Sequence, residues 1–515
     1  MTAGYSHTCA LDTAGKVYCW GFNSSGQLGD NSTTNSLTPV AVNVTAGTAA
    51  MNGRTITQVV ATTEHTCALD TLGQVYCWGQ NGTGQLGDNS TTNRFTPVAV
   101  NVTAGTAAMS GKTITQITAG YHHTCALDTA GQVYCWGQND NGQLGDNSTT
   151  DSLIPVAVNV TAGTAAMNGK TITQITANNS HTCALDTAGK VYCWGYNGYG
   201  KLGDNSTAQR TTPVAVNTTA GTAAMNNKTI IQIVADLEST CALDTAGQVY
   251  CWGNNTFGQL GDNSTTHHST PVAVNTTAGT AAMNGKTIVQ IAASNYHACA
   301  LDSTDQVYCW GWNNYGQLGD NSTTNGLTPV AVNTAVGSAI MDGKAISQIT
   351  TGGYYSCALG TVGQVYCWGR NNNGQLGDNS TTDSLTSVCV HTIYDGTGSK
   401  LPGLGCGAYE LTVVMDADGT PAPCINVVIA ADGLSLACTT TTHVAGMVDV
   451  TVDDGISPQA LASGYEYVEE DGGGALIKKI LSPSTGVGKI ISLAVLGEIV
   501  FVAVGVAVFF KLKEV

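Results

Sequence analysis

The sequence predicts an all-β chain: a seven-bladed β-propeller, then an immunoglobulin-like β-sandwich and one C-terminal transmembrane helix. Three observations lead to this prediction. Cysteine pairs recur at a fixed period, each repeat holds four strand-like segments, and one long apolar run lies near the C-terminus. The 515 residues suffice for several hydrophobic cores. The expected parts are the propeller, the sandwich, a linker and the helix, at residues 1–395, 401–469, 470–489 and 490–510.

Fourteen of the 18 cysteines form seven pairs with constant spacing. The members of a pair are ten positions apart, and each pair lies 58 positions after the previous one. A period of this order indicates a propeller, a solenoid or an array. The copy from Thr113 to Lys170 contains strand-like segments at 113–117, 123–128, 132–137 and 154–159. Four strands in each of seven copies predict the propeller, and an elongated solenoid is the alternative.

The segment CALDTAGQVYC predicts a hairpin with a Thr-Ala-Gly loop. Pairing outward from the loop places Leu127 opposite Val133 and Cys125 opposite Cys135, within disulfide reach. We therefore predict one cross-strand disulfide per blade, with metal binding as the alternative. So many paired cysteines indicate an oxidising, extracytoplasmic compartment. The predicted pairs are Cys9–Cys19, Cys67–Cys77, Cys125–Cys135, Cys183–Cys193, Cys241–Cys251, Cys299–Cys309 and Cys357–Cys367.

The skeleton of GYHHTCALDTAGQVYCWGQNDNGQLGDNS resembles the regulator-of-chromosome-condensation repeat, and all seven copies carry it. The resemblance implies a seven-bladed propeller, in agreement with the strand count. Members of that family include a nuclear nucleotide-exchange factor, bacterial surface proteins and a secreted β-lactamase inhibitor. The resemblance therefore implies that loops are presented to a protein partner, without identifying the partner.

The charge of the chain excludes one class of partner. The formal net charge is −17, and only 18 residues are Lys or Arg. A nucleic-acid-binding protein needs a basic face to meet the phosphates. We therefore expect no nucleic acid partner, and no chromatin role like that of the nuclear relative.

The stretch after the repeats is also rich in strand-like segments. It resembles an IPT/TIG immunoglobulin-like module through GTPAPCINVVIAADGLSLACTT, HVAGMVDVTV and GYEYV. The resemblance implies a spacer module. We expect Cys424–Cys438, which flank the ADG hairpin, to pair, and the remaining two cysteines to form Cys389–Cys406.

Residues 490–510 are mostly apolar, and as a helix about 31 Å long they would span a bilayer. The motif SPSTG at 482–486, this run and the short basic tail resemble the sortase sorting signal of Gram-positive cell-wall proteins. That resemblance implies cleavage between Thr485 and Gly486, although Ser482 stands where the family has Leu. A wall anchor and a retained membrane anchor are the two alternatives, and both place the propeller at the cell surface.

Met1 begins inside a repeat, just before the Tyr5-Ser6-His7 loop. We therefore expect the first copy to lack its innermost strand. No signal peptide precedes this point, although the disulfides require export. Both features predict an N-terminally truncated product whose missing strand would close the ring.

The nearly identical copies differ mainly in three loop clusters: before the His position, after Trp-Gly, and after DNST, where Arg94, Phe95, Arg210, His267 and His268 lie. In an up-and-down blade these loops share one face, here called the variable face. Aromatic and arginine side chains are typical interface anchors. We predict that this face binds an extracellular protein or glycan, with relaxed drift in long loops as the alternative. The candidate residues are Tyr5, Phe22, Tyr121, Tyr196, Tyr199, Phe257, Tyr296, Trp312, Tyr315, Tyr354 and Arg370.

The leading functional interpretation is a surface-displayed binding or adhesion protein. An extracellular carbohydrate-active or other hydrolytic enzyme and an inhibitor of a secreted enzyme are the alternatives. We find no catalytic motif, although an unrepeated carboxylate pair on the variable face would favour an enzyme. No cofactor or metal is expected, with calcium binding by Asp30 and its equivalents as the alternative to backbone capping. The recurring histidines, at His7, His65, His123, His181 and His297, are interpreted as structural.

Overall fold

The computed structural model describes residues 1–391 except 46–49, 104–107, 162–165, 220–223, 277–281, 334–340 and 342. Beyond residue 391 it describes only strands β29 to β38. The chain divides into two compact units. The first comprises Met1–Ile393 with Pro402–Cys406, and the second comprises Tyr394–Leu401 with Gly407–Val515.

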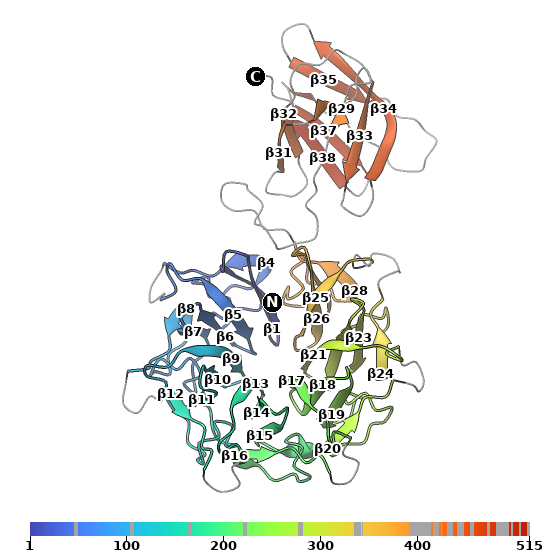
Figure 1. The fold of residues 1–515 in the computed structure, drawn as a ribbon. Coiled ribbons are helices and arrows are strands. Elements are labelled where there is room, and N and C mark those ends of the chain that lie inside the picture. The colour runs from blue at the N-terminus through green and yellow to red at the C-terminus, as the bar shows by residue number, and fades with distance from the viewer. Residues whose placement is uncertain are drawn as a thin grey trace. The chain divides into compact units, whose positions relative to one another are not determined.

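The first unit is a propeller of seven four-stranded antiparallel sheets, each built from consecutive strands (Figure 1). A short 3₁₀ helix, η1, lies at Gly198–Gly200. The blades are β1 (Thr2–Ala3), β2 (His7–Leu11), β3 (Val17–Gly21), β4 (Ser36–Ala41); β5 (Ile56–Ala61), β6 (His65–Asp70), β7 (Val75–Gly79), β8 (Arg94–Ala99); β9 (Ile114–Ala119), β10 (His123–Asp128), β11 (Val133–Gly137), β12 (Ser152–Ala157); β13 (Ile172–Asn178), β14 (His181–Asp186), β15 (Val191–Gly195), β16 (Arg210–Ala215); β17 (Ile230–Ala235), β18 (Ser239–Asp244), β19 (Val249–Gly253), β20 (His268–Ala273); β21 (Ile288–Ser294), β22 (His297–Asp302), β23 (Val307–Gly311), β24 (Gly326–Ala331); and β25 (Ile346–Thr351), β26 (Tyr355–Gly360), β27 (Val365–Gly369), β28 (Ser384–Cys389).

The ring closes where the last blade meets the first. The inner strands face the centre of the ring, and β1 lies beside β25 (Figure 1). The Met1 amino group donates to Gln348 Oε1 at 3.1 Å, and Gln348 Nε2 donates back to the Met1 carbonyl at 3.0 Å. An elongated solenoid would leave these two ends apart, so the closed ring excludes that alternative.

One expectation about the first blade is wrong. We expected its innermost strand to be missing, but β1 is present as a two-residue strand. Thr2 pairs with Cys9 and Ala3 with Thr8. Thr350 and Gln348 of the last blade also hold this segment.

The predicted hairpin and its disulfide are confirmed. Leu127 lies opposite Val133 and Cys125 opposite Cys135, in the predicted register. All seven cross-strand disulfides form, each with Cα atoms 4.1 Å apart. These cysteines are therefore not metal ligands. All seven disulfides are buried, and six lie in cores shared by neighbouring blades, as Cys125 and Cys135 do with Trp194 of the next blade.

One backbone carbonyl organises each junction between blades. The carbonyl of Gln27, in the loop after β3, accepts from Trp78 Nε1 at 2.9 Å and from Thr66 Oγ1 at 2.8 Å. Because Thr66 gives its only hydroxyl hydrogen to this carbonyl, His7 Nε2, 2.9 Å from the Thr66 oxygen, must be the donor to it. His7 is therefore the Nε2–H tautomer.

The Trp-to-carbonyl bond is present at all seven junctions, with distances of 2.9–3.0 Å. It includes Trp20 to Gln375, which joins the first blade to the last. Burial lowers the pKa of His7 to about 3, so the ring is neutral near pH 7. These contacts agree with the structural interpretation of the recurring histidines.

The second unit is described only as strands: β29 (Val414–Met415), β30 (Ala422–Pro423), β31 (Ile425–Ile429), β32 (Leu436–Thr439), β33 (Met447–Asp453), β34 (Pro458–Glu470), β35 (Gly474–Lys479), β36 (Ala494–Val495), β37 (Glu498–Ala503) and β38 (Val506–Lys511). The stretch is β-rich as predicted. The predicted linker, however, contains β35. This strand pairs with β34 in an antiparallel register that runs from Gly474 opposite Glu470 to Lys479 opposite Tyr465. The pairings Cys424–Cys438 and Cys389–Cys406 depend on residues outside the described ones, as does the Thr485–Gly486 motif.

The structure differs from the prediction of a helix over 490–510. Strands β36, β37 and β38 lie there, and Val500 is opposite Phe509 in an antiparallel pair. The run is rich in Val, Ile and Phe, which favour strands, and apolar composition alone does not separate a helix from buried strands. In the described part of the chain, no helix has the length and apolar character required to cross a membrane.

We predict that Gly87→Ala destabilises the propeller more than Gly111→Ala does. Both glycines have a positive φ, 69° and 72°, so alanine strains the backbone at each by about 1–2 kcal/mol. A Cβ at Gly87 would also lie 2.7 Å from Trp136 Nε1, whereas one at Gly111 meets nothing within 4 Å. Overpacking should therefore add about 1–3 kcal/mol at Gly87. Equal losses in calorimetric Tm would contradict this account of the junction.

Candidate partner-binding face

The loops of the variable face meet as the sequence predicts. Phe257, between the third and fourth strands of one blade, lies 5.3 Å from Tyr296, between the first and second strands of the next. The two kinds of loop therefore share one face. The candidate residues in them are partly exposed, with Tyr196 and Tyr199 the most exposed, at 38% and 47%.

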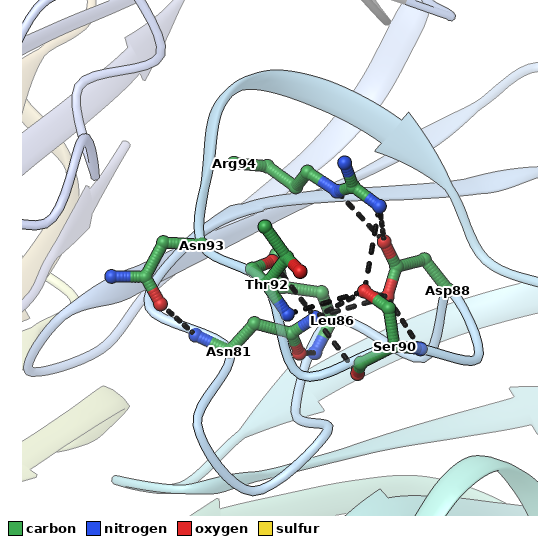
Figure 2. Close-up of polar contacts among 7 residues, drawn as sticks. All are labelled: Asn81, Leu86, Asp88, Ser90, Thr92, Asn93 and Arg94. Carbon is green, nitrogen blue, oxygen red and sulfur yellow. Dashed lines mark hydrogen bonds and ion pairs between the residues drawn. The ribbon is translucent and has the colours of Figure 1, made fainter.

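A buried asparagine holds each long loop of this face. Figure 2 shows Asn81, in the loop between β7 and β8. Its side-chain amide donates to Asp88 Oδ1 at 2.9 Å and to the carbonyls of Ser90 and Thr92, while its oxygen accepts from the Leu86 backbone at 3.0 Å. One fully buried side chain thus ties together both ends of the loop, so the residues beside it are held in place before any partner arrives.

These internal contacts also occupy the charged residues that follow DNST. Arg94 forms an ion pair with Asp88 at 2.7 Å (Figure 2), and Arg210 forms one with Asp204 at 2.6 Å. Hydrogen bonding to Ser90 and Arg94 lowers the pKa of the Asp88 carboxyl, although burial opposes the shift. Among the described residues no cluster of three or more His, Cys, Asp or Glu could hold a metal ion. Within its own loop the Asp88 carboxylate accepts hydrogen bonds from the Asn81 amide and from the backbone and hydroxyl of Ser90.

Eight of the candidate residues form one continuous group, here called the aromatic cluster. Trp312 is its hub: its ring stacks on Phe257 at 5.3 Å and meets Tyr354 edge-on at 5.0 Å. Tyr354 in turn contacts Tyr5 at 5.2 Å, and Tyr5 contacts Tyr121 at 6.2 Å. The members are Tyr5, Tyr121, Phe257, Tyr296, Trp312, Tyr315, Tyr354 and Arg370.

Polar contacts hold the cluster in this arrangement. The Arg370 guanidinium lies 4.9 Å from the Tyr315 ring and 5.4 Å from the Tyr354 ring, within cation–π range. The Tyr5 hydroxyl donates to the Tyr354 hydroxyl at 2.8 Å. Burial raises the pKa of Tyr354, so its phenol remains protonated at physiological pH.

The cluster borders the centre of the ring. The Tyr121 hydroxyl donates to Asn295 Oδ1 at 2.8 Å, a bond from the third blade to the sixth. A cavity of about 280 Å³ adjoins the cluster, since Tyr5, Tyr121 and Asn295 are among the residues that line it, together with Thr, Ala, Gln, Val and Ile of the inner strands. Tyr121 and Asn295 occupy the same position in their repeats. Counted from Tyr5 in periods of 58 residues, Tyr121 lies two periods later and Asn295 lies five periods later.

Three candidate residues lie apart from the cluster. Tyr196 stands over Lys201, whose Nζ is 4.6 Å from the ring centroid. Tyr199 packs on His267 with ring centroids 4.8 Å apart. Phe22 is half-buried, and none of the ring contacts found among the described residues involves it. The structure thus divides the eleven candidates into one cluster of eight and three separate positions.

Sequence reasoning missed a charged group beside Tyr296. Lys201 stands where the other copies have Gln, and its fully buried ammonium lies 2.7 Å from Glu238 Oε2. Burial lowers the pKa of Lys201, and Glu238 partly offsets this effect. The signal was present in the copies, because GKLG replaces GQLG only in the fourth repeat.

Asp236 and Glu238 are an unrepeated carboxylate pair on the variable face, the feature that would favour an enzyme. Asp236 is only 1% exposed, and its carboxylate accepts hydrogen bonds from Ser239 Oγ and from the backbone of Leu237 and Tyr296. Glu238 is paired with Lys201. Because Asp236 is enclosed and Glu238 is neutralised, the pair joins neighbouring blades and does not face a substrate.

We predict that Asp236→Asn removes a component of the pH dependence of stability. Burial raises the pKa of Asp236 from 3.8 to about 6. As the pH rises, this carboxyl therefore loses its proton at a lower pH in the unfolded chain than in the folded protein. Wild-type stability should therefore fall across this window, by up to about 3 kcal/mol at this group. Asparagine does not titrate. We expect the free energy of unfolding of the variant minus that of wild type, measured by denaturant unfolding, to increase by up to about 3 kcal/mol between pH values below 4 and above 6. The buried histidines, common to both proteins, cancel in the difference, and a flat difference would contradict the prediction.

Comparisons with known proteins agree with the fold. A family profile described as the RCC1-like domain matches residues 1–222 and 105–424. The Ultraviolet-B receptor UVR8 of Arabidopsis thaliana is 31% identical over 384 residues, 74% of this chain and 79% of that protein. The E3 ubiquitin-protein ligase HERC2 of Mus musculus is 27% identical over 409 residues, 79% of this chain but only 8% of HERC2.

Two solved structures share the fold at low sequence identity. Human WBSCR16 has a TM-score of 0.60 at 19% identity, covering 73% of this chain and 94% of that one. Yeast RCC1 (Prp20), solved with Kap60, has a TM-score of 0.60 at 20% identity, covering 75% of this chain and 85% of that one. The family profile and the plant receptor cover most of the chain, which therefore belongs to the RCC1-like domain family.

Proposed function

We propose that this protein is a cell-surface recognition scaffold whose propeller binds an extracellular protein or glycan through the aromatic cluster. The observation that carries the proposal is the composition of the cluster: seven partly exposed aromatic rings and one arginine in mutual contact on one face. Trp, Tyr and Arg are the residues most enriched among those that dominate binding energy.

The rigidity of the loops supports the same proposal. A loop held by a buried asparagine loses little conformational freedom when a partner binds, so less of the interaction energy is spent on ordering it. The ring contacts within the cluster have the same effect on its side chains.

A solved relative binds proteins. One structure of yeast RCC1 (Prp20) is described as bound to Kap60, and another structure of the same protein by its binding properties to Gsp1p and histones. We infer a similar use of the propeller here, with a different kind of partner. The net charge of −17 and the pairing of Arg94, Arg210 and Lys201 with carboxylates disfavour both nucleic acid and the chromatin setting.

Display outside the cell is part of the proposal. The seven disulfides support an oxidising compartment, since cytosolic thiols are kept reduced. For attachment we propose the C-terminal segment, with the sorting-like motif at Thr485–Gly486 and the apolar stretch after it. This part of the proposal rests on sequence alone, including the spacer role of the immunoglobulin-like module.

We expect Trp312→Ala and Arg370→Ala each to weaken partner binding by about 30-fold or more, because each removes an anchor of the cluster. The probes are a glycan array and a library of displayed surface proteins, with binding to each hit then measured by biolayer interferometry. Phe95→Ala is the matched control, since Phe95 is 42% exposed on the same face but outside the cluster. If the glycans or proteins found in these screens bind both cluster variants as tightly as they bind wild type, the aromatic cluster is not the binding site.

We also expect the protein isolated from its own cells to show the seven Cys-x9-Cys links in non-reducing peptide mass spectrometry. The short, buried hairpin geometry brings each pair together without any other change in the fold. Free thiols at these positions in freshly alkylated cells would overturn the extracellular assignment.

A further inference from the structure

Each blade carries one Asn-Ser-Thr triplet at the same place, directly after the Asp of GDNS. Asn-x-Ser/Thr is the acceptor sequence for N-glycosylation, found on surface loops of exported proteins. The seven asparagines are Asn31, Asn89, Asn147, Asn205, Asn263, Asn321 and Asn379.

The structure leaves all seven accessible. Each of these asparagines is exposed and has a left-handed backbone, with φ between 60° and 67°. In the described part of the chain, none of their side-chain amide nitrogens donates a hydrogen bond, and the one contact found, from Thr211 to Asn147, is to the carboxamide oxygen. The carboxamide nitrogen, which is the atom that a glycan would be attached to, is therefore not engaged in a hydrogen bond among the described residues.

The threonine of the triplet has no structural role to explain it. Asp88 and Ser90 hold the loop, as Figure 2 shows, and Asn89 suits a left-handed turn. Thr91, by contrast, is exposed and makes no side-chain hydrogen bond among the described residues. The same is true of its six equivalents, yet all seven copies retain Thr.

We propose that these seven asparagines are N-glycosylation sites. The carboxamide nitrogen would bond to the anomeric carbon of an oligosaccharide carried on a lipid diphosphate. The bond from that carbon to the diphosphate oxygen breaks, the lipid diphosphate leaves, and the amide nitrogen loses one proton. No electrons are transferred, and the donor is the substrate of a membrane oligosaccharyltransferase. The inference rests on the export that forms part of the proposed function.

One further triplet, Asn227-Lys228-Thr229, meets the same criteria, since Asn227 is exposed with a φ of 58°. Several other Asn-x-Ser/Thr sequences are disfavoured by their contacts. Asn23 and Asn81 are 0% exposed, and their amides hold the long loops. A glycan on either would prevent the loop from folding. Asn43 also begins such a triplet, but it is only partly exposed, and its oxygen accepts from both the backbone of Thr45, at 3.0 Å, and the Thr45 hydroxyl, at 3.4 Å. Asn101, Asn159 and Asn217 make the equivalent bonds.

The proposed glycans would lie in the loops between the third and outermost strands, around the aromatic cluster at the centre of the ring. Few of the residues are charged, at 10%, so sugar hydroxyls would supply much of the hydration of this face. A partner would then reach the cluster from the centre of the face and not from its rim.

The test is a peptide map of the full-length protein isolated from its own cells and treated with peptide N-glycosidase in H₂¹⁸O. We expect ¹⁸O-labelled Asp at the seven triplet positions, with Asn23 and Asn81 unlabelled. Unmodified asparagine at all seven, with the disulfides intact, overturns the glycosylation while leaving export in place. Reduced cysteines in the same digest overturn export, and label at Asn23 or Asn81 overturns the structural selection of sites.

A matched pair of variants tests one site. Thr91→Ala should abolish modification of Asn89, because it removes the acceptor hydroxyl without breaking any contact of the fold. Thr92→Ala should leave the modification in place, since the triplet is intact and the fourth repeat already has Ala208 there. Both proteins should show the same Tm after enzymatic deglycosylation. Modification that persists in Thr91→Ala, or disappears in both variants, would refute the assignment.

Discussion

The structure depends on one backbone carbonyl in each blade, which accepts a hydrogen bond from a tryptophan of the next blade at all seven junctions. At six of them it also accepts from a Thr or Ser hydroxyl, while Ala298 leaves the Gln259 carbonyl with the tryptophan alone. The carbonyl of Gln27 has two lone pairs, and the Trp78 indole and the Thr66 hydroxyl occupy them. Repeated around the ring, this contact sets the position of each sheet against its neighbour. It also buries the tryptophan, which is fully enclosed at every junction. Loss of either donor would leave a buried acceptor partly unsatisfied, which is costly in a dry interior.

Because the acceptor belongs to the backbone, the side chain at that position is free to change. In the fourth repeat Lys201 replaces Gln, and its carbonyl still accepts from Trp252 Nε1 and Thr240 Oγ1, both at 2.9 Å. Its ammonium meanwhile pairs with Glu238 of the next blade. The fold is therefore kept while a new ion pair enters the variable face. This separation of scaffold and surface explains how near-identical repeats carry a single, asymmetric aromatic cluster.

Ring closure is what brings that cluster together. Tyr5 belongs to the first blade and Tyr354 to the last, yet their hydroxyls are 2.8 Å apart. Tyr121 reaches Asn295 three blades away. Neither contact could form in an open array, since their partners are far apart in the chain. The proposed binding face is thus a property of the closed ring, and the proposed glycans would surround it.

The sequence by itself determined what depends on short-range geometry. The strand count, the hairpin register that places Cys125 opposite Cys135, and the face shared by the variable loops follow from alternation and turn chemistry within one repeat. Only the tertiary structure decided which aromatic residues meet, that Thr2 and Ala3 form a short strand, and that Asp236 is enclosed. The strands within 490–510 were also beyond sequence reasoning, because an apolar run fits either a helix or paired strands until its partners are known. Local hydrogen bonds and side-chain alternation act within a few residues, whereas contacts between blades exist only once the whole ring has closed.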